Sequence, residues 1–262
     1  MKLLSFELFY DILYMSRYID NHLKYKTKYL NMKGGYTKEI YLIRHGQTEW
    51  NRLGKGQGQE ADIPLNDIGK EESHKTGQYL EKFRILDKQF DCIYASPMLR
   101  TKETANIIKN IIKFEEDIIY EDDLKERKQG KLSGLTKSDP FYPSYKKLRD
   151  ELMPTDPIEK YKEHSNIMTM ISNKLDIGME NDRDLEDRAY RIISKIVDSK
   201  HNKIMVISHG GLLLAMIRKL FNIIRSPEGD FTNGDNCWIA YLTYNNKEYK
   251  LLSPPNTEHL SL

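Results

Sequence analysis

Two short apolar runs that each end in histidine and glycine constrain this fold most strongly. They are YLIRHG at residues 41–46 and IMVISHGG at residues 204–211. Each run is rich in β-branched residues, as buried strands are, and the residues after the second run have helical spacing. The same alternation of strand and helix recurs along the chain. It predicts an α/β fold, a three-layer sandwich with a mostly parallel central sheet flanked by helices.

The remaining elements follow from periodicity and from capping residues. Ser96 followed by Pro97 predicts a helix N-cap and first helical residue, and Asn66 predicts another N-cap. We expect a terminal hairpin around Asn245-Asn246. The expected strands are 39–44, 90–95, 118–121, 203–208, 237–244 and 249–252, and the expected helices are 66–83, 96–112, 185–199 and 211–221.

Two segments differ from this core. Residues 1–36 have the apolar spacing of an amphipathic helix and end at Gly34-Gly35, which predicts an appended leader helix. Such a helix either packs on the body or docks on a membrane surface or a partner. Residues 37–262 are expected to form the main domain. Within it, residues 130–182 hold several prolines and predict loops and short helices, a helical insertion or lid.

Composition excludes several classes of protein. The chain has 41 Lys and Arg against 39 Asp and Glu, a net charge of +2, so we expect no nucleic-acid partner. Cys92 and Cys237 are too few and too far apart for a disulfide scaffold or a cysteine zinc site, which is typical of a reducing compartment. No apolar run is long enough to span a membrane. We therefore expect a cytoplasmic protein without stable membrane insertion, of undefined oligomeric state.

The two histidines admit three interpretations: structural residues, metal ligands or a phosphate site. Both lie where a strand ends, and ligands bind at that edge of a parallel sheet. Arg44 directly precedes His45, and a cation is costly beside a divalent metal, so no metal is expected. Arginine instead suits phosphate oxygens, and Arg100 lies one turn into the helix after the second strand. The residues therefore favour a phosphate site with a nucleophilic imidazole.

Four ordered blocks, RHGQTEWN, SPMLRTKETA, LKERKQGKLSGL and SHGG, resemble the histidine phosphatase superfamily, in the branch that includes cofactor-dependent phosphoglycerate mutases. The resemblance runs from about residue 39 to residue 240. It implies that His45 is the nucleophile and becomes a phosphohistidine. It also implies that Arg44, Arg100 and His209 surround the phosphoryl group, and that Glu126 protonates the leaving oxygen.

The resemblance also implies a set of substrate-binding residues. Asn51 would help to hold the phosphoryl group, and glycines after the histidines would let backbone N–H groups approach it. Gln57-Gly58 is similar to phosphatase members, whereas Lys137 falls at the lysine that contacts the substrate carboxylate in mutases. Glu180, in the segment 178–188, resembles an acidic residue near the family's pocket. The expected binding residues are Asn51, Gly46, Gln57, Gly58, Gly210 and Lys137.

The motifs leave more than one activity open. Gln129 replaces a tyrosine of the mutase motif, and Lys146, Lys147 and Arg149 are the nearest substitutes for its arginine pair. We therefore expect a phosphatase that hydrolyses small phosphate monoesters of metabolites and needs no cofactor. The alternative is a phosphoglycerate mutase primed by 2,3-bisphosphoglycerate. A non-catalytic phosphate-binding module is a third possibility.

Overall fold

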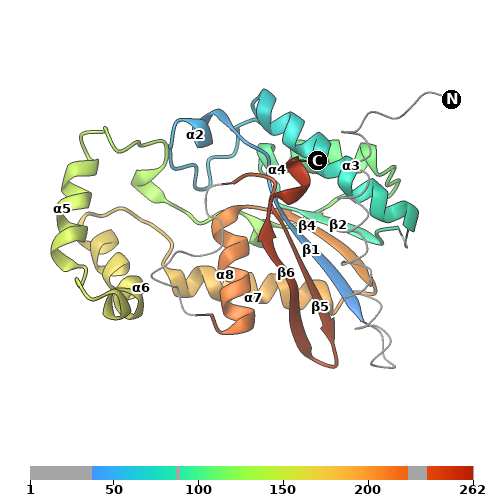
Figure 1. The fold of residues 1–262 in the computed structure, drawn as a ribbon. Coiled ribbons are helices and arrows are strands. Elements are labelled where there is room, and N and C mark those ends of the chain that lie inside the picture. The colour runs from blue at the N-terminus through green and yellow to red at the C-terminus, as the bar shows by residue number, and fades with distance from the viewer. Residues whose placement is uncertain (1–36, 87–88, 224–234, 262) are drawn as a thin grey trace.

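The computed structural model describes residues 37–86, 89–223 and 235–261 (Figure 1). The leader helix predicted for residues 1–36 lies outside the described residues. Within the described part, no helix is both long enough and apolar enough to cross a membrane.

A six-stranded sheet of order β3-β2-β4-β1-β5-β6 forms the middle layer. Neighbouring strands from β3 to β1 run parallel, and the last two strands are antiparallel, so the expected mostly parallel sheet is confirmed. β5 runs antiparallel to β1, and the hairpin that joins β5 to β6 makes the edge pair antiparallel as well. The strands are β1 (Lys38–Arg44), β2 (Cys92–Ala95), β3 (Ile119–Tyr120), β4 (Lys203–Ser208), β5 (Ile239–Asn245) and β6 (Glu248–Asn256).

Helices cover both faces of the sheet, as Figure 1 shows. On β1, Ile40 and Leu42 point into one core with α7 and α8, whereas Tyr41 and Ile43 point into the other core with α3 and α4. This alternation is the two-residue period of a strand that is buried on both faces. The flanking helices are α3 (Asp67–Leu86), α4 (Leu99–Ile111), α7 (Asp182–Val197) and α8 (Gly210–Phe221), and a short α2 (Glu49–Arg52) follows β1.

The segment that was expected to form an insertion carries its own apolar cluster. It contains α5 (Tyr142–Leu152) and α6 (Pro157–Lys174), which are longer than the short helices expected. Two 3₁₀ helices, η1 (Asp122–Leu124) and η2 (Gly130–Leu132), come before α5, and α7 follows α6. Tyr145, Leu148 and Ile171 are buried against one another in a cluster separate from the two faces of the sheet. The segment therefore packs largely on itself, beside the carboxyl ends of the parallel strands (Figure 1).

Two local predictions about turns and caps were inaccurate. The helix predicted from Ser96 begins at Leu99, with Met98 as an N-cap that makes no side-chain cap bond. Ser96 cannot cap it because its hydroxyl is buried against His209. The terminal hairpin turns at Asn246 and Lys247, one residue later than expected, and both have the positive φ that a two-residue hairpin loop favours. Asn66 does cap α3, accepting from the Gly69 N–H at 2.8 Å.

A buried histidine of the C-terminal 3₁₀ helix η3 (Glu258–Ser261) makes stability depend on pH. His259 lies against Thr76, 3.0 Å from its hydroxyl, and burial lowers its pKa to about 4. The unfolded chain therefore binds this proton more readily below about pH 6.5, and stability is lost as pH falls toward 4. At pH 5 we expect this group to cost about 2 kcal/mol of unfolding free energy. Urea unfolding at pH 7 and pH 5 measures the loss, which His259→Gln should reduce; an equal loss in both proteins would contradict the assignment.

Candidate active site

The carboxyl ends of three neighbouring strands bring the predicted residues together. β2, β4 and β1 are adjacent and parallel, with Arg44 in register with Ser208 and Ala95 in register with Ile207. The residues that follow these strands are Ser96, His209 and His45, so they lie in a row along one sheet edge. This edge is where the sequence placed the ligand site.

His45, the nucleophile predicted from the sequence, is held as a neutral imidazole. Its Nδ1 donates to the Gly46 carbonyl oxygen at 2.7 Å, because that oxygen can only accept, and this leaves the lone pair on Nε2. The ring is 3% exposed and lies 5.2 Å from the His209 ring, centroid to centroid. Burial, followed by the Arg100 and Arg44 guanidiniums, holds the pKa of His45 well below that of a free imidazole. The ring is therefore uncharged at neutral pH, with its one proton on Nδ1.

His209 lies at the start of α8 with one ring nitrogen unsatisfied. Its Nε2 is 2.9 Å from the Ser96 hydroxyl, and its buried Nδ1 has no hydrogen-bond partner among the described residues. Burial lowers its pKa well below the ordinary value, and Arg100 and His45 lower it further. A buried polar atom without a partner is costly, and a bound ligand would remove that cost.

Two buried guanidiniums supply the positive charge of the site. Arg100 is fully buried and donates to the carbonyl oxygens of Glu60 at 2.8 Å and Gly58 at 2.9 Å, while its Nε has no partner in the described structure. Burial lowers the pKa of Arg100 to about 10, so it stays charged at neutral pH. Arg44 is 9% exposed and donates to the Asp235 carbonyl at 2.9 Å. The charges of Arg44 and Arg100 both act on the His45 ring and lower its pKa.

Glu126 lies in the loop between η1 and η2, with its carboxylate at the N-terminus of α8. Oε2 accepts from the Gly211 N–H at 3.0 Å, and Oε1 accepts from the N–H groups of Leu212 at 3.1 Å and Arg127 at 2.7 Å. Helix N-termini favour a carboxylate through free N–H groups and the helix dipole. The carboxylate also acts electrostatically on both Arg44 and Arg100, so the predicted acid is near the predicted phosphate residues.

The predicted binding residues have more varied surroundings. The Gly46 N–H is bonded to Thr104 at 3.0 Å, and a Cβ at Gly46 would meet the Gly69 carbonyl oxygen at 2.3 Å. Gly46 is therefore required for packing against α3. Asn51 closes a capping box with Thr48, and its Oδ1 also accepts from Asn236 Nδ2 at 3.3 Å.

The remaining predicted residues lie outside the helices and strands, except Gly210, which begins α8. Gln57 is 8% exposed, and its oxygen has no partner in the described residues. Gly58 has φ +49° and presents its carbonyl to Arg100. A Cβ at Gly210 would lie 3.2 Å from Arg44 Nε, so glycine permits this close approach. Lys137 lies farther out, in the wall of a pocket shared with Gly54 and Gly56.

Three polar residues near the histidines were missed as site residues from the sequence. Ser96 bonds to His209, Thr104 holds the Gly46 N–H, and Asn236 Nδ2 donates to the His45 carbonyl at 3.1 Å. Position at a strand end was the available signal for Ser96, but its proximity to Pro97 favoured a cap. Nothing in the local sequence marks Thr104 or Asn236. No group of three His, Cys, Asp or Glu residues that could hold a metal occurs among residues 37–86, 89–223 and 235–261.

Comparison with known proteins identifies the family. The family profile described as "Histidine phosphatase superfamily (branch 1)" matches residues 40–257. The chain belongs to the histidine phosphatase superfamily. The four sequence blocks therefore identified the family correctly, and superfamily membership supports an enzyme that acts on phosphate esters.

Similar members of the superfamily include proteins named as phosphatases. The chain is 27% identical over 223 residues to an "uncharacterized phosphatase PhoE" of Bacillus subtilis, a match covering 85% of this chain and 96% of that protein. It is 32% identical over 186 residues to a "metal-independent phosphoserine phosphatase" of Arabidopsis thaliana, covering 70% and 68%. A crystal structure of a phosphoglycerate mutase from Bacillus anthracis has the same fold, with a TM-score of 0.69 at 21% identity over 87% of this chain and 96% of that one.

A methyl group at Gly211 is expected to displace the predicted acid of this histidine phosphatase family member. A Cβ there would lie 2.4 Å from Glu126 Oε1, whereas the helical backbone accepts alanine readily. We expect Gly211→Ala to lower kcat/KM for an alkyl phosphate by about 10–100-fold, because a small misplacement of a catalytic group has a large effect. Steady-state kinetics beside a thermal melt measures both effects. Unchanged kcat/KM, or a loss that follows a collapse of Tm, would contradict this prediction.

Proposed function

We propose that this protein is a phosphatase that hydrolyses small phosphate monoesters through a phosphohistidine at His45. One observation carries the proposal. A buried, neutral imidazole presents its Nε2 lone pair in a site where two guanidiniums and a second histidine converge. That combination suits nucleophilic attack on a phosphoryl dianion, since the guanidiniums neutralise its equatorial oxygens.

In the first step, His45 Nε2 attacks phosphorus and the bond from phosphorus to the ester oxygen breaks. Glu126 acts as the general acid and gives a proton to the departing oxygen, so the alcohol leaves neutral and Glu126 becomes a carboxylate. Arg44, Arg100 and His209 hold the phosphoryl oxygens, with Asn51 contributing its amide. General acid catalysis of this kind is worth roughly 10²–10⁴-fold when the leaving group is an alkoxide.

In the second step, a water molecule attacks the phosphohistidine. Glu126 takes one proton from that water, the bond between phosphorus and His45 Nε2 breaks, and inorganic phosphate is released. The lone pair returns to Nε2 and Glu126 regains its proton, so the cycle closes without a metal or an organic cofactor. The name of the metal-independent relative supports this expectation.

A pocket of about 280 Å³ has Arg127, the neighbour of Glu126, in its wall and would hold the organic part of the substrate. Its lining joins the loop containing Gly54 and Gly56 to the segment that includes α5, and this supports our proposal that residues 130–182 form a specificity insertion within the domain 37–262. The wall contains cations, tyrosines and apolar side chains but no carboxylate among the described residues. The lining is Gly54, Gly56, Arg127, Gln129, Leu132, Leu135, Thr136, Lys137, Tyr142, Tyr145, Arg149 and Met179.

The charge of this pocket favours the phosphatase over the mutase alternative. Arg127 is paired with Asp182, and Arg149 is paired with Asp150 at 3.0 Å. Lys137 forms no ion pair with a described residue. A mutase must retain a bisphosphate primer by binding its second acidic end. One lysine without an ion-pair partner among the described residues would bind a bisphosphate weakly. Lys137 still supports a mutase as the second candidate, because it occupies the position that contacts the carboxylate in mutases.

The test is a product analysis with 3-phosphoglycerate, phosphoserine and sugar phosphates, run with and without EDTA and with and without 2,3-bisphosphoglycerate. The phosphatase releases inorganic phosphate in stoichiometric amount, with no isomerised product and no loss in EDTA. Rapid formation of 2-phosphoglycerate only in the presence of the primer would favour the mutase. Phosphate binding without turnover of any ester would favour the non-catalytic module.

Removing the charge of Lys137 is expected to weaken binding of substrates that carry a carboxylate. The lysine is exposed, so solvent screens its charge, and we expect Lys137→Ala to raise KM for phosphoserine about three- to tenfold at low salt. KM for glycerol phosphate, which lacks the carboxylate, should stay within about twofold of the wild-type value. Lys131→Ala is the matched control, because Lys131 is exposed nearby but paired with Asp176. Equal KM changes in the two variants would contradict the prediction.

A further inference from the structure

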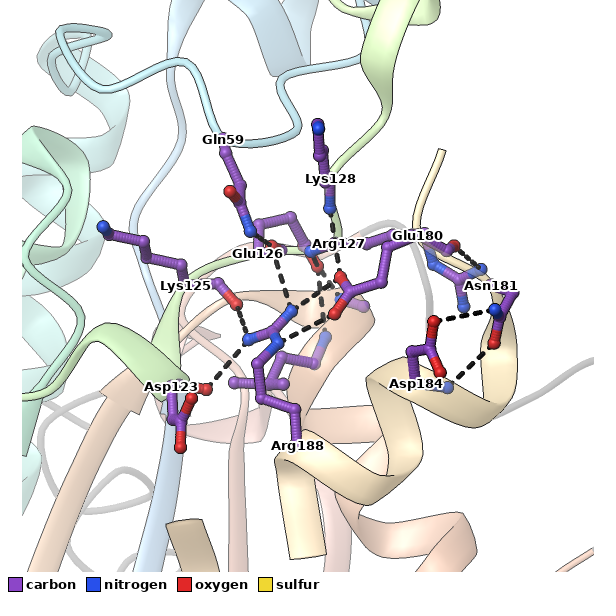
Figure 2. Close-up of polar contacts among 12 residues, drawn as sticks. Gln59, Asp123, Lys125, Glu126, Arg127, Lys128, Glu180, Asn181, Asp184 and Arg188 are labelled. Carbon is purple, nitrogen blue, oxygen red and sulfur yellow. Dashed lines mark hydrogen bonds and ion pairs between the residues drawn. The ribbon is translucent and has the colours of Figure 1, made fainter. Parts of the chain in front are cut away.

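Arg188 on α7 binds the backbone that carries Glu126. Figure 2 shows its guanidinium between the carboxylate of Glu180 and the carbonyl groups of the loop at residues 123–126. Nη1 donates to the carbonyl oxygens of Asp123 at 2.9 Å and Lys125 at 2.7 Å, and Nη2 donates to that of Glu126 at 3.3 Å. The remaining two N–H groups bind Glu180, from Nε at 2.8 Å and from Nη2 at 2.7 Å. All five N–H groups of the guanidinium are therefore used.

Glu180 holds the same loop from its other side. Its Oε2 accepts from the Lys128 N–H at 3.2 Å, and its own N–H donates to the Lys128 carbonyl at 2.9 Å. The side chains of Arg188 and Glu180 are 11% and 14% exposed, so the pair is largely shielded from water. Backbone groups on both sides of Glu126 are thus fixed to one part-buried ion pair, and bidentate pairs of this kind define orientation as well as charge.

The position of the Glu126 carboxylate depends on two anchors. One is the N-terminus of α8, where the Gly211 and Leu212 N–H groups bind the carboxylate directly. The other is Arg188 on α7, which binds only backbone carbonyl groups of the Glu126 loop. α7 and α8 share one apolar core, so the two anchors have a fixed spacing. A change at Arg188 would move the loop away from α8 without removing any group that touches the substrate.

We infer that Arg188, held by Glu180, is a positioning residue that keeps Glu126 within reach of the leaving oxygen. This inference rests on the proposed function, in which Glu126 is the general acid. It assigns Glu180 a role in aligning Glu126, without contact between Glu180 and the phosphate. It also predicts a selective kinetic effect, since an acid matters only for leaving groups that need a proton.

The experiment compares Arg188→Lys with wild type across phosphate monoesters whose leaving groups range from 2,4-dinitrophenol to an alkyl alcohol. Lysine keeps the charge beside Glu180 but cannot span the carbonyl groups. We use kcat/KM, because it reports the phosphorylation step even when phosphohistidine hydrolysis limits turnover. We expect about a 30-fold loss for the alkyl phosphate and less than about a threefold loss for the dinitrophenyl ester. Arg191→Lys is the matched control, because Arg191 lies on the same helix but binds the Asp123 side chain at the surface.

A second pair of variants separates positioning from general stability. In a Glu126→Gln background, Arg188→Lys should cause no further loss on the alkyl phosphate, since residues that act through one group are not additive. Glu180→Gln should give a smaller loss with the same leaving-group selectivity. Losses that are uniform across the esters, or that add to those of Glu126→Gln, would overturn the inference while leaving the proposed function intact. A wild-type protein that hydrolyses none of the esters would instead overturn the proposed function, and the inference with it.

Discussion

His45→Ala is expected to abolish phosphatase activity, lowering kcat by at least about 10⁴-fold, because the covalent route needs a nucleophile. We expect no other described group to replace it, because His45 Nε2 combines a free lone pair with the charges of Arg44 and Arg100. The decisive measurement is trapping of the phosphoenzyme. Labelled substrate quenched during turnover should leave label on the wild-type protein that is lost in acid and stable in base, as expected of a phosphohistidine. The variant should carry none.

The control for this prediction is His74→Ala. His74 is exposed on α3 and belongs to no part of the site, so activity should stay within about twofold of wild type. Label that persists on His45→Ala would contradict His45 as the nucleophile. Label that is stable in acid would instead indicate a phosphoester on a serine or threonine hydroxyl.

Glu126→Gln is expected to remove the proton donor while keeping the size of the side chain. For an alkyl phosphate, kcat/KM should fall by about 10²–10⁴-fold, the range of general acid catalysis. For 2,4-dinitrophenyl phosphate, the loss should be less than about tenfold, because that leaving group departs without a proton. The amide has one acceptor oxygen and cannot satisfy the N–H groups of Gly211, Leu212 and Arg127 together, so Tm should also fall, an effect that is the same whichever ester is assayed.

The matched control for this variant is Glu121→Gln. Glu121 directly precedes η1, the 3₁₀ helix ahead of the Glu126 loop, and pairs with the exposed Lys195 at 2.7 Å, so its loss should leave both esters unaffected. If Glu126→Gln lowered hydrolysis of the two esters equally, Glu126 would be acting as a structural cap of α8 and another group would supply the proton.

Sequence patterns determined the framework of the fold because they depend on neighbours along the chain. Strand β4 was predicted at its observed bounds, 203–208, and β1 within one residue, because buried strands are uninterrupted apolar runs. The ends of those strands then brought His45 and His209 to one edge. The local pattern gave a wrong prediction at Ser96, where a serine followed by proline predicted a helix N-cap. The hydrogen-bond partner of that hydroxyl is His209, which is distant along the chain.

By itself, the sequence determined the family, the α/β architecture, and the histidines and arginines of the candidate site, because each is encoded within one short block. Only the tertiary structure decided how those blocks interact. It brought the Glu126 carboxylate to the N-terminus of α8, aligned Arg188 with three carbonyl groups of the Glu126 loop, and paired Arg127 and Arg149 with aspartates. The reason is that the partner of a charge or a hydroxyl is set by which distant segments pack together. No residue type or local spacing encodes that choice.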